Sequence, residues 1–280
     1  MSTARLEQTM LQFPQIDPVA LQVGPLAIHW YGLMYVLAFL ASYLLASYRA
    51  NKNHGGWNQE QVSDLMFYAM LGVIVGGRLG YFIFYQPPAS YLLDPLRIVM
   101  VQTGGMSFHG GMLGVAAGIA FFAHKYKRHF LDITDFVVPI VPLGLAFGRI
   151  GNFINGELWG RLTSPDFPLA MVFPHVDQLP RHPSQLYQMA LEGFLLFAFL
   201  WWYSSTIRPR GRVLALFLIG YGLARFIVEF VRQPDAHLSF IALNWVTMGH
   251  LLSLPMIIGG IGLYIYSCRM QRKSNNEKLS

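Results

Sequence analysis

Residues 62–85, VSDLMFYAMLGVIVGGRLGYFIFY, are apolar over a length that is sufficient to cross a lipid bilayer as a helix. About 20 mainly apolar residues are needed for such a crossing. We predict six further spans, at roughly 27–48, 106–123, 133–154, 185–205, 213–232 and 245–267. In the span at 133–154, Pro139 and Pro142 predict a kink. The sequence therefore predicts an all-α, polytopic integral membrane protein with about seven transmembrane helices.

The composition supports this class and excludes an ordinary soluble domain. Hydrophobic residues make up 54% of the 280 residues and charged residues only 12%, whereas soluble domains carry about 25% charged residues. The single cysteine, Cys268, excludes an intrachain disulfide and a cysteine cluster for metal. The first 25 residues lack a basic segment followed by a cleavage pattern, so we expect no cleaved signal peptide.

The distribution of Lys and Arg outside the predicted spans gives an orientation. Four lie on the side of the N-terminus, and twelve lie on the opposite side in much shorter segments. Cytoplasmic loops carry the excess of basic residues in membrane proteins. We therefore expect the N-terminus outside and the C-terminus in the cytoplasm.

Four arginines lie inside or at the ends of predicted spans: Arg78, Arg149, Arg225 and Arg232. A cation at the centre of a membrane helix costs about 2.5–3.5 kcal/mol. The predicted orientation puts all four in the outer half of the membrane. One interpretation is an anionic ligand there, such as a lipid phosphate; the alternative is that each side chain extends to the interface.

The span at 213–232 carries a polar stripe of Tyr221, Arg225, Glu229 and Arg232. At 3.6 residues per turn, these side chains fall within an arc of roughly 80°. Glu229 is spaced to pair with Arg225 or with Arg232. A structural ladder of ion pairs explains the glutamate, but it leaves two cations against one anion, a surplus that an anionic lipid would offset.

Residues 148–160, GRIGNFINGELWG, end the predicted span at 133–154. Arg149 and Asn152 are spaced to project together from a helix. Glycines between 151 and 160 permit a broken helix end or a close approach of the backbone to a ligand. With Glu157 in the same stretch, we interpret this segment as a polar ligand site at the membrane edge.

Residues 104–111, GGMSFHGG, begin another predicted span and contain His109. An imidazole titrates near neutral pH, which makes His109 the natural candidate for a general base. A lone histidine is more often structural or interfacial, and this alternative stays open. Glu192 has two equal interpretations, a partner for an arginine or a helix–helix hydrogen bond. The proline-rich stretch 155–184 predicts a small folded cap over the site.

Five stretches together resemble the bacterial phosphatidylglycerol–prolipoprotein diacylglyceryl transferase family. They are 28–32 (IHWYG), 104–111, 148–160, 182–187 (HPSQLY) and 221–235 (YGLARFIVEFVRQPD). Residues 148–160 meet the family pattern G-R-x-G-N-F-x-N-x-E-x-x-G in full. The stretches follow the family order over nearly the whole chain, so the resemblance implies a single catalytic domain over residues 1–280.

The resemblance also implies an activity and a location. The family moves the diacylglyceryl group of phosphatidylglycerol to the thiol of the lipobox cysteine of prolipoproteins, which forms a thioether and releases glycerol phosphate. The implied partners are the donor lipid and prolipoprotein signal peptides, with no nucleic acid, and no metal or organic cofactor is implied. The implied location is the bacterial inner membrane, with the active site towards the periplasmic leaflet.

Site residues follow from the resemblance, position by position. The predicted catalytic residues are Tyr31, His109, Arg149 and Arg225. The predicted substrate-binding residues are Arg78, Arg149, Asn152, Glu157, Gly160, Tyr221, Glu229 and Arg232. Arg78 is the least assigned of these, as either a second phosphate contact or a bridge between helices. Without these motifs, a transporter or flippase of an anionic phospholipid would explain the arginines equally well.

Overall fold

The computed structural model describes residues 10–52, 54–86, 94–100, 104–234, 241, 243 and 245–277. The chain forms two compact units. The first unit comprises residues 1–42 and 137–280, and the second comprises residues 43–136. Each unit is described by itself below. The described residues are mainly helical, as predicted.

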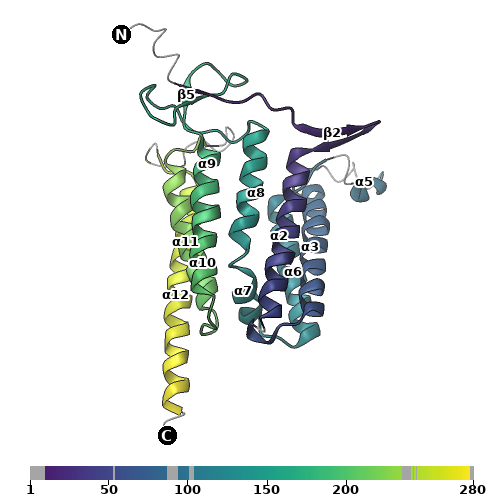
Figure 1. The fold of residues 1–280 in the computed structure, drawn as a ribbon, viewed down its shortest axis with the longest axis vertical. Coiled ribbons are helices and arrows are strands. Elements are labelled where there is room, and N and C mark those ends of the chain that lie inside the picture. Colours follow the sequence, from purple (N-terminus) through teal and green to yellow (C-terminus); the bar gives the residue numbers. More distant parts are fainter. Residues whose placement is uncertain are drawn as a thin grey trace. The chain divides into compact units, whose positions relative to one another are not determined.

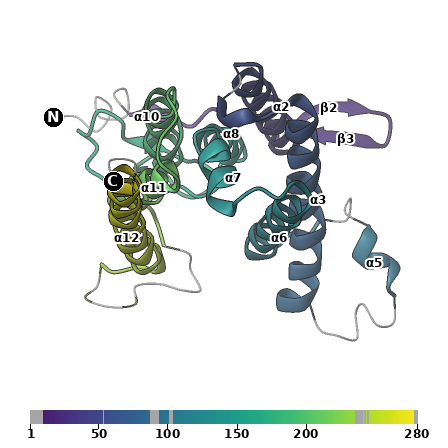
Figure 2. The ribbon, with the colours of Figure 1, turned by 90° about the horizontal axis from the view of Figure 1, so that it is seen from below.

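The second unit is built around a pair of closely packed helices, α3 (Gln59–Tyr85) and α6 (Phe108–Tyr126). Figures 1 and 2 show them side by side. A Cβ atom on Gly76 would lie 2.7 Å from the Cα atom of Gly114, and one on Gly80 would lie 2.7 Å from the Cα atom of Gly110. Such distances are too short for any side chain, so glycine is what allows the two backbones to touch.

The other helices of the second unit are short or shared with the first. They are the later part of α2 (Trp30–Asn51), η1 (His54–Gly56), α5 (Leu96–Val99) and most of α7 (Phe130–Val137). α3 begins where Asn58 accepts a hydrogen bond from the backbone N–H of Gln61, a standard N-terminal cap. α6 begins in the same way at Ser107, which accepts from the N–H of Gly110. The caps fix where each helix starts, and hence where its first side chains lie.

The first unit contains the remaining helices. They are α8 (Val141–Ile154), α9 (Ser184–Gln188), the π-helix η3 (Met189–Leu195), α10 (Leu196–Tyr203), α11 (Arg212–Glu229) and α12 (Met248–Glu277). α9, η3 and α10 follow one another without a break, and α11 packs along α12 (Figure 1). η3 packs on α8, where a Cβ atom on Gly193 would lie 2.6 Å from that of Ala146. Helical structure is interrupted between Val137 and Val141, so the predicted kink at the prolines is confirmed.

Five short strands were not predicted. β1 (Leu11–Gln12) pairs in parallel with β4 (Met171–Val172), which pairs antiparallel with β5 (Pro180–Arg181). β2 (Val19–Val23) and β3 (Leu26–His29) form an antiparallel hairpin that leads into α2. The Phe13 ring stacks on Phe173 at 5.2 Å, and both side chains are buried. The stretch 155–184 thus shares a small core and a sheet with the N-terminal segment, while its role as a cap over the site stays a prediction.

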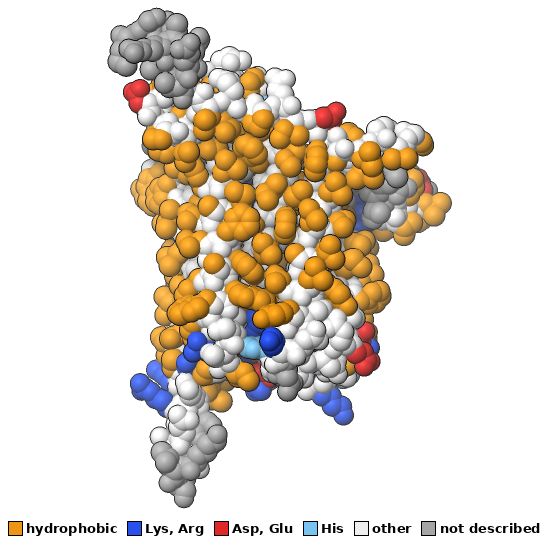
Figure 3. All heavy atoms as spheres, in the orientation of Figure 1, with side chains coloured by type: hydrophobic (Ala, Val, Ile, Leu, Met, Phe, Trp, Pro, Cys, Tyr) orange, Lys and Arg blue, Asp and Glu red, His pale blue; other side chains and the backbone are white. Residues whose placement is uncertain are grey.

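The described helices are those of a membrane protein. α2, α3 and α12 are long and apolar enough to cross a bilayer, and α7 with α8 supplies a fourth candidate if the two form one span. Figure 3 shows hydrophobic side chains along the length of the helices. Each of the seven predicted runs overlaps helix in the described part of the chain, although the run at 27–48 begins within β3, the run at 133–154 is broken, and the run at 213–232 extends past the end of α11. Seven crossings and the orientation of the termini stay predictions.

Candidate active site

Glu192 is the carboxylate on which two of the predicted phosphate-binding arginines converge. Its Oε2 lies 3.6 Å from Nη2 of Arg149 on α8, and its Oε1 lies 3.8 Å from Nη1 of Arg225 on α11. Gln188 donates to Oε1 at 3.3 Å. The side chain is completely buried and lies in the π-helix η3, a type of irregular turn that is common at functional sites. Of the two interpretations left open for Glu192, the structure favours the partner for an arginine.

The predicted polar stripe forms the ion pairs that its spacing predicts, although α11 ends at Glu229 and Arg232 lies three residues beyond it. Nη2 of Arg225 lies 2.6 Å from Oε2 of Glu229, and Nη1 of Arg232 lies 3.6 Å from Oε1. Tyr221 lies one turn before Arg225 and stacks on Phe217 with ring centroids 5.8 Å apart. The addition of Arg149 and Glu192 makes a cluster of three arginines and two glutamates. With both carboxylates ionised, the cluster has a net charge of +1. This equals the net charge of the stripe alone, but it is spread over five charged groups instead of three.

The end of α8 carries a chain of polar contacts away from Arg149. Its Nη1 donates to Oδ1 of Asn152 at 3.3 Å, and Nδ2 of Asn152 donates to Oε1 of Glu157 at 2.9 Å. Gln185 donates to the backbone carbonyl of Glu157 at 2.7 Å, which ties this segment to α9. The structure therefore brings Arg149, Asn152 and Glu157 together, as the predicted ligand site requires.

Tyr31 lies against α8 at the level of the same site. A Cβ atom on Gly151 would lie 2.7 Å from Cδ2 of the Tyr31 ring, so glycine is required for this contact. The Tyr31 ring also meets Tyr35 edge-on with centroids 5.3 Å apart. The first turn of α2 thus places Tyr31 beside Asn152, the residue that follows Gly151 in the chain.

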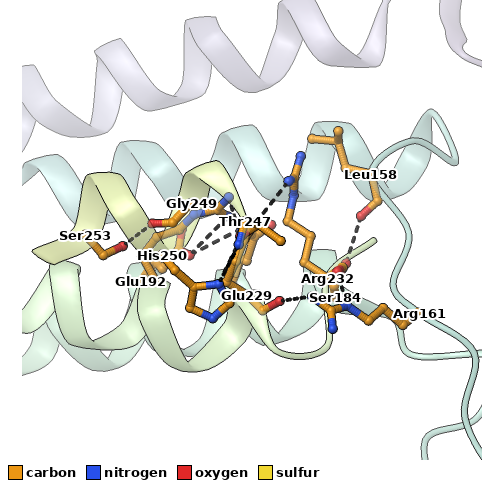
Figure 4. Close-up of polar contacts among 12 residues, drawn as sticks. Leu158, Arg161, Ser184, Glu192, Glu229, Arg232, Thr247, Gly249, His250 and Ser253 are labelled. Carbon is orange, nitrogen blue, oxygen red and sulfur yellow. Dashed lines mark hydrogen bonds and ion pairs between the residues drawn. The ribbon is translucent and has the colours of Figure 1, made fainter. Parts of the chain in front are cut away.

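Gly160 is enclosed by backbone. Its N–H donates to the carbonyl of His182 at 2.8 Å, and it forms a bridge with Arg232. A Cβ atom there would lie 2.7 Å from the Val231 carbonyl oxygen, so no side chain fits. The neighbouring Arg161 donates to the carbonyls of Arg232 at 2.9 Å and Glu229 at 3.0 Å (Figure 4). These contacts fasten the segment after α8 to the end of α11 and explain a glycine at this position; its role in substrate binding stays a prediction.

Two side chains in the segment between α8 and α9 have shifted pKa values. Burial lowers the pKa of His182, so its imidazole is neutral at pH 7. The guanidinium of Arg181 holds the pKa of Asp177 below its ordinary value through hydrogen bonds of 3.2 and 2.5 Å. His182 therefore contributes no charge to the site at neutral pH.

His109 belongs to the second unit and lies on the first turn of α6. Its side chain is exposed and borders a pocket of about 460 Å³ that Phe84, Tyr85 and Ser107 also line. Ser107 caps α6, and its N–H donates to the carbonyl of Gly77 on α3 at 2.8 Å. The position of the imidazole is thus set by the junction between α3 and the start of α6.

Arg78 is buried in the second unit and donates to five backbone carbonyls. Nε donates to Ile98 at 3.0 Å, and Nη2 donates to Arg97 at 2.5 Å and Met100 at 2.8 Å. Nη1 donates to Gly104 and, at 2.9 Å, to Gly105. The guanidinium also lies over the Phe82 ring at 4.9 Å. These contacts hold the backbone at residues 97–100 and 104–105, and the predicted contact with substrate stays untested.

The predicted site residues are therefore divided between the two units. The first unit holds Tyr31, Arg149, Asn152, Glu157, Gly160, Tyr221, Arg225, Glu229 and Arg232, and the second holds Arg78 and His109. The sequence did not identify Thr247, which donates to Glu229 at 2.7 Å, or His250, which contacts Thr247. Neither lies in a stretch with a polar pattern, so no local signal marked them.

Comparison with known proteins identifies the family. The sequence model of the family described as prolipoprotein diacylglyceryl transferase matches residues 18–266. The chain belongs to this family.

Three curated relatives carry the name phosphatidylglycerol–prolipoprotein diacylglyceryl transferase. That of Bordetella bronchiseptica is 56% identical over 262 residues, covering 93% of this chain and 98% of the relative. That of Coxiella burnetii is 55% identical over 256 residues, covering 91% and 97%. That of a Marinomonas species is 52% identical over 262 residues, covering 93% and 96%.

Membership of the diacylglyceryl transferase family confirms the resemblance seen in the sequence. It also decides between the two functions that the arginines alone left open, because the relatives are named as transferases. The chain is therefore an enzyme that transfers a group, and the lipid transporter is the less supported alternative.

Proposed function

We propose that this enzyme transfers the diacylglyceryl group of phosphatidylglycerol to the thiol of the lipobox cysteine in prolipoproteins. The observation that carries the proposal is the cluster of Arg149, Arg225 and Arg232 on two buried glutamates, at the ends of apolar helices. A net positive site within apolar surroundings suits an anionic phosphodiester head group. The family assignment supplies the donor and acceptor classes.

The reaction forms one bond and breaks another. The sulfur of the acceptor cysteine attacks the glyceryl carbon that carries the phosphate, so a C–S bond forms as the C–O bond breaks. Glycerol phosphate leaves with the electron pair of the broken bond and gains negative charge. The thiol must lose its proton before or during the attack, because the thiolate is the nucleophile.

Arg149 and Arg225 stabilise the leaving phosphate in this proposal. Their side chains are 21% and 16% exposed, and the single carboxylate Glu192 lies between them at ion-pair distances of 3.6 and 3.8 Å. Both distances are longer than a direct hydrogen bond, so the two guanidinium groups share one carboxylate and keep N–H donors for a ligand. Preorganised cations in a water-poor site are effective at stabilising charge that develops in a transition state.

The other polar residues orient substrate or hold the arginines. Tyr31, Asn152 and Tyr221 contact the glycerol or phosphate oxygens in the proposal. Glu229 holds Arg225 and Arg232, which is supported by its distances of 2.6 and 3.6 Å to them. Glu157 and Gly160 order the segment 155–184, which we propose to be a cap over the site within a single catalytic domain. Its small core and its bonds to the end of α11 support that role.

His109 accepts the thiol proton in this proposal. Support comes from its exposure beside a pocket, and histidine is the side chain that most often acts as a general base. Replacement by glutamine should lower the transfer rate by about 10²–10⁴-fold, the usual contribution of a general base, and flatten the rate against pH. His124, exposed at the other end of α6, gives a matched control as His124→Gln. A His109→Gln enzyme with the parent's rate and pH profile would assign the base to another group.

We further propose seven membrane spans in the bacterial inner membrane, with the N-terminus and the site on the periplasmic side and the C-terminus in the cytoplasm. The imbalance of basic residues supports this orientation. The test is a chain with Cys268→Ala and a single new cysteine at exposed Ser164 or exposed Ser205. In spheroplasts, an impermeant thiol reagent should label Ser164→Cys at once but Ser205→Cys only after lysis. The reverse pattern would contradict the orientation.

The decisive test of the activity combines purified protein, phosphatidylglycerol and a synthetic lipobox peptide. We expect the peptide to gain the mass of one diacylglyceryl group, and glycerol phosphate to appear in equal amount. A peptide with serine in place of the lipobox cysteine should gain nothing. Movement of phosphatidylglycerol across vesicle bilayers without any transfer to peptide would instead support the lipid transporter.

A further inference from the structure

The start of α12 contacts the carboxylate that holds two of the site arginines. Thr247, directly before α12, donates from Oγ1 to Oε1 of Glu229 at 2.7 Å (Figure 4). The Thr247 and His250 side chains are 2% and 1% exposed. Nδ1 of His250 accepts the Thr247 backbone N–H at 3.2 Å and lies 3.1 Å from Thr247 Oγ1. Glu229, Thr247 and His250 thus form one buried chain of contacts.

The hydrogen-bonding pattern assigns a direction to this chain. Nδ1 of His250 has one lone pair, and the backbone N–H of Thr247 occupies it, so the ring proton is on Nε2. The single hydroxyl proton of Thr247 is then directed to Glu229. A side chain three residues into a helix that accepts from the cap residue's N–H is the second half of a capping box, a position usually held by glutamate or glutamine. His250 takes that place here and fixes Thr247.

Packing leaves this turn little freedom to move. A Cβ atom on Gly249 would lie 2.6 Å from Oε1 of Glu229, so the first turn of α12 touches the carboxylate directly. The His250 ring meets those of Phe226 and Phe230 at 4.7 Å each, and that of Trp245 at 5.4 Å. A helix N-terminus also favours a nearby negative charge. The start of α12 is therefore a rigid support on one side of Glu229.

We propose that Thr247 and His250 are positioning residues for the transfer reaction. They fix the Glu229 carboxylate, and through it the guanidinium groups of Arg225 and Arg232, in the geometry that receives the lipid phosphate. This inference rests on the proposed function. It assigns to the start of α12 a role in the site that its apolar sequence does not suggest.

The first test removes the hydroxyl and keeps the shape. Thr247→Val should lower kcat/KM for phosphatidylglycerol by about tenfold, the effect of one lost hydrogen bond to a charged group. Most of the loss should appear in KM for the lipid, and KM for the peptide should not change. Thr247→Ser keeps the hydroxyl, so its kcat/KM for phosphatidylglycerol should stay within about twofold of the parent value. Ser253→Ala is the matched control. It removes a buried hydroxyl of α12 that donates to the carbonyl of Gly249 and not to Glu229.

A second pair of variants tests His250 without a change at Thr247. His250→Gln keeps an acceptor for the Thr247 N–H, while His250→Leu removes it. We expect the glutamine variant to retain most of the activity and the leucine variant to match Thr247→Val. This pair still tests the inference if Thr247→Val does not fold.

A double-mutant cycle separates a role through Glu229 from a general loss of structure. In a Glu229→Gln background, Thr247→Val should lower kcat/KM by less than twofold further, because both changes remove the same interaction. Additive losses, or a Thr247→Val enzyme no different from Ser253→Ala, would overturn the inference. Failure of the proposed function is separate from this, since it would appear as a parent protein that transfers no diacylglyceryl group.

Discussion

Arg78 and Arg149 have similar local sequences and different surroundings. Each directly follows a glycine in an apolar helix, Gly77 in one unit and Gly148 in the other. All five N–H groups of a guanidinium can donate, and Arg78 donates to five backbone carbonyls. Among the described residues, Arg149 contacts one amide oxygen and one carboxylate oxygen, and it is 21% exposed. Arg78 therefore holds a segment of chain, and Arg149 is the one that we propose to bind a ligand.

The difference teaches that an arginine in a membrane helix is explained by its partners and not by its position. Backbone carbonyl oxygens carry a partial negative charge, and a folded segment can direct several of them at one guanidinium. Five of them accept hydrogen bonds from Arg78. Glu192 is one full charge shared between two arginines, so its cluster remains positive. Three substitutions test this contrast, beginning with the one that we expect to have the largest effect, and a fourth tests a partly exposed ion pair for comparison.

Glu192→Gln should have the largest effect on stability. It removes the carboxylate between Arg149 and Arg225 and leaves buried cations without that partner, a change that typically costs about 3–5 kcal/mol. For a chain of this size, the melting temperature in detergent should fall by on the order of 10 °C. Glu60→Gln, the same change at an exposed carboxylate, is the control and should leave the melting temperature within about 1 °C. An unchanged melting temperature for Glu192→Gln would show that the arginines do not depend on this carboxylate.

Arg149→Lys should have the largest effect on activity among the arginines. Lysine keeps the charge and loses the planar fork of donors, so the transfer rate should fall by about 10²–10³-fold, as for the loss of one transition-state donor. The melting temperature should stay close to the parent value, because the charge beside Glu192 remains. Rates are measured with phosphatidylglycerol and a lipobox peptide. Full activity in this variant would remove Arg149 from the phosphate site.

Arg78→Lys should have a smaller effect on rate and a visible effect on local structure. An ammonium has three N–H donors, so at least two of the five carbonyls lose their partner, at a cost of about 1–3 kcal/mol each where they stay buried. We expect faster proteolysis within residues 94–107 and a loss of activity of about tenfold or less. Arg97→Lys, an exposed change in the same segment, is the control. A loss of activity as deep as that of Arg149→Lys, with unchanged proteolysis, would make the two arginines equivalent.

The ion pair of Asp177 and Arg181 should have the smallest effect. Arg181 holds the pKa of Asp177 below its ordinary value, so the pair stabilises the fold above pH 4 and this contribution is lost as the pH falls through the lowered pKa. Because the pair is partly exposed, its worth is about 1 kcal/mol or less. The difference in melting temperature between the parent and Asp177→Asn should therefore shrink between pH 7 and pH 3. A difference that is constant with pH would show that the charge of Asp177 does not contribute.

The membrane class and the individual polar pairs were predictable because they depend on local periodicity. Glu229 and Arg225 lie one turn apart on α11, Arg232 follows three residues after the end of that helix, and the seven apolar runs overlap helices in the described residues. The π-helix around Glu192 was not predictable, because the extra residue in its turn is accommodated by packing against α8. The pairing of β1 with β4 joins residues about 160 positions apart, and no local pattern records such a contact.

The sequence by itself determined that the chain is helical and membrane-embedded, that it carries arginines at a high energetic cost, and which family it belongs to. These properties follow from hydropathy, from the period of a helix and from a fixed motif. Only the tertiary structure decided the partners that come from distant segments: backbone for Arg78, the Glu192 carboxylate for Arg149, and Thr247 for the Glu229 carboxylate that pairs with Arg225. The reason is physical, because the environment of a buried charge is made by segments that are distant in the chain and meet only in the folded protein.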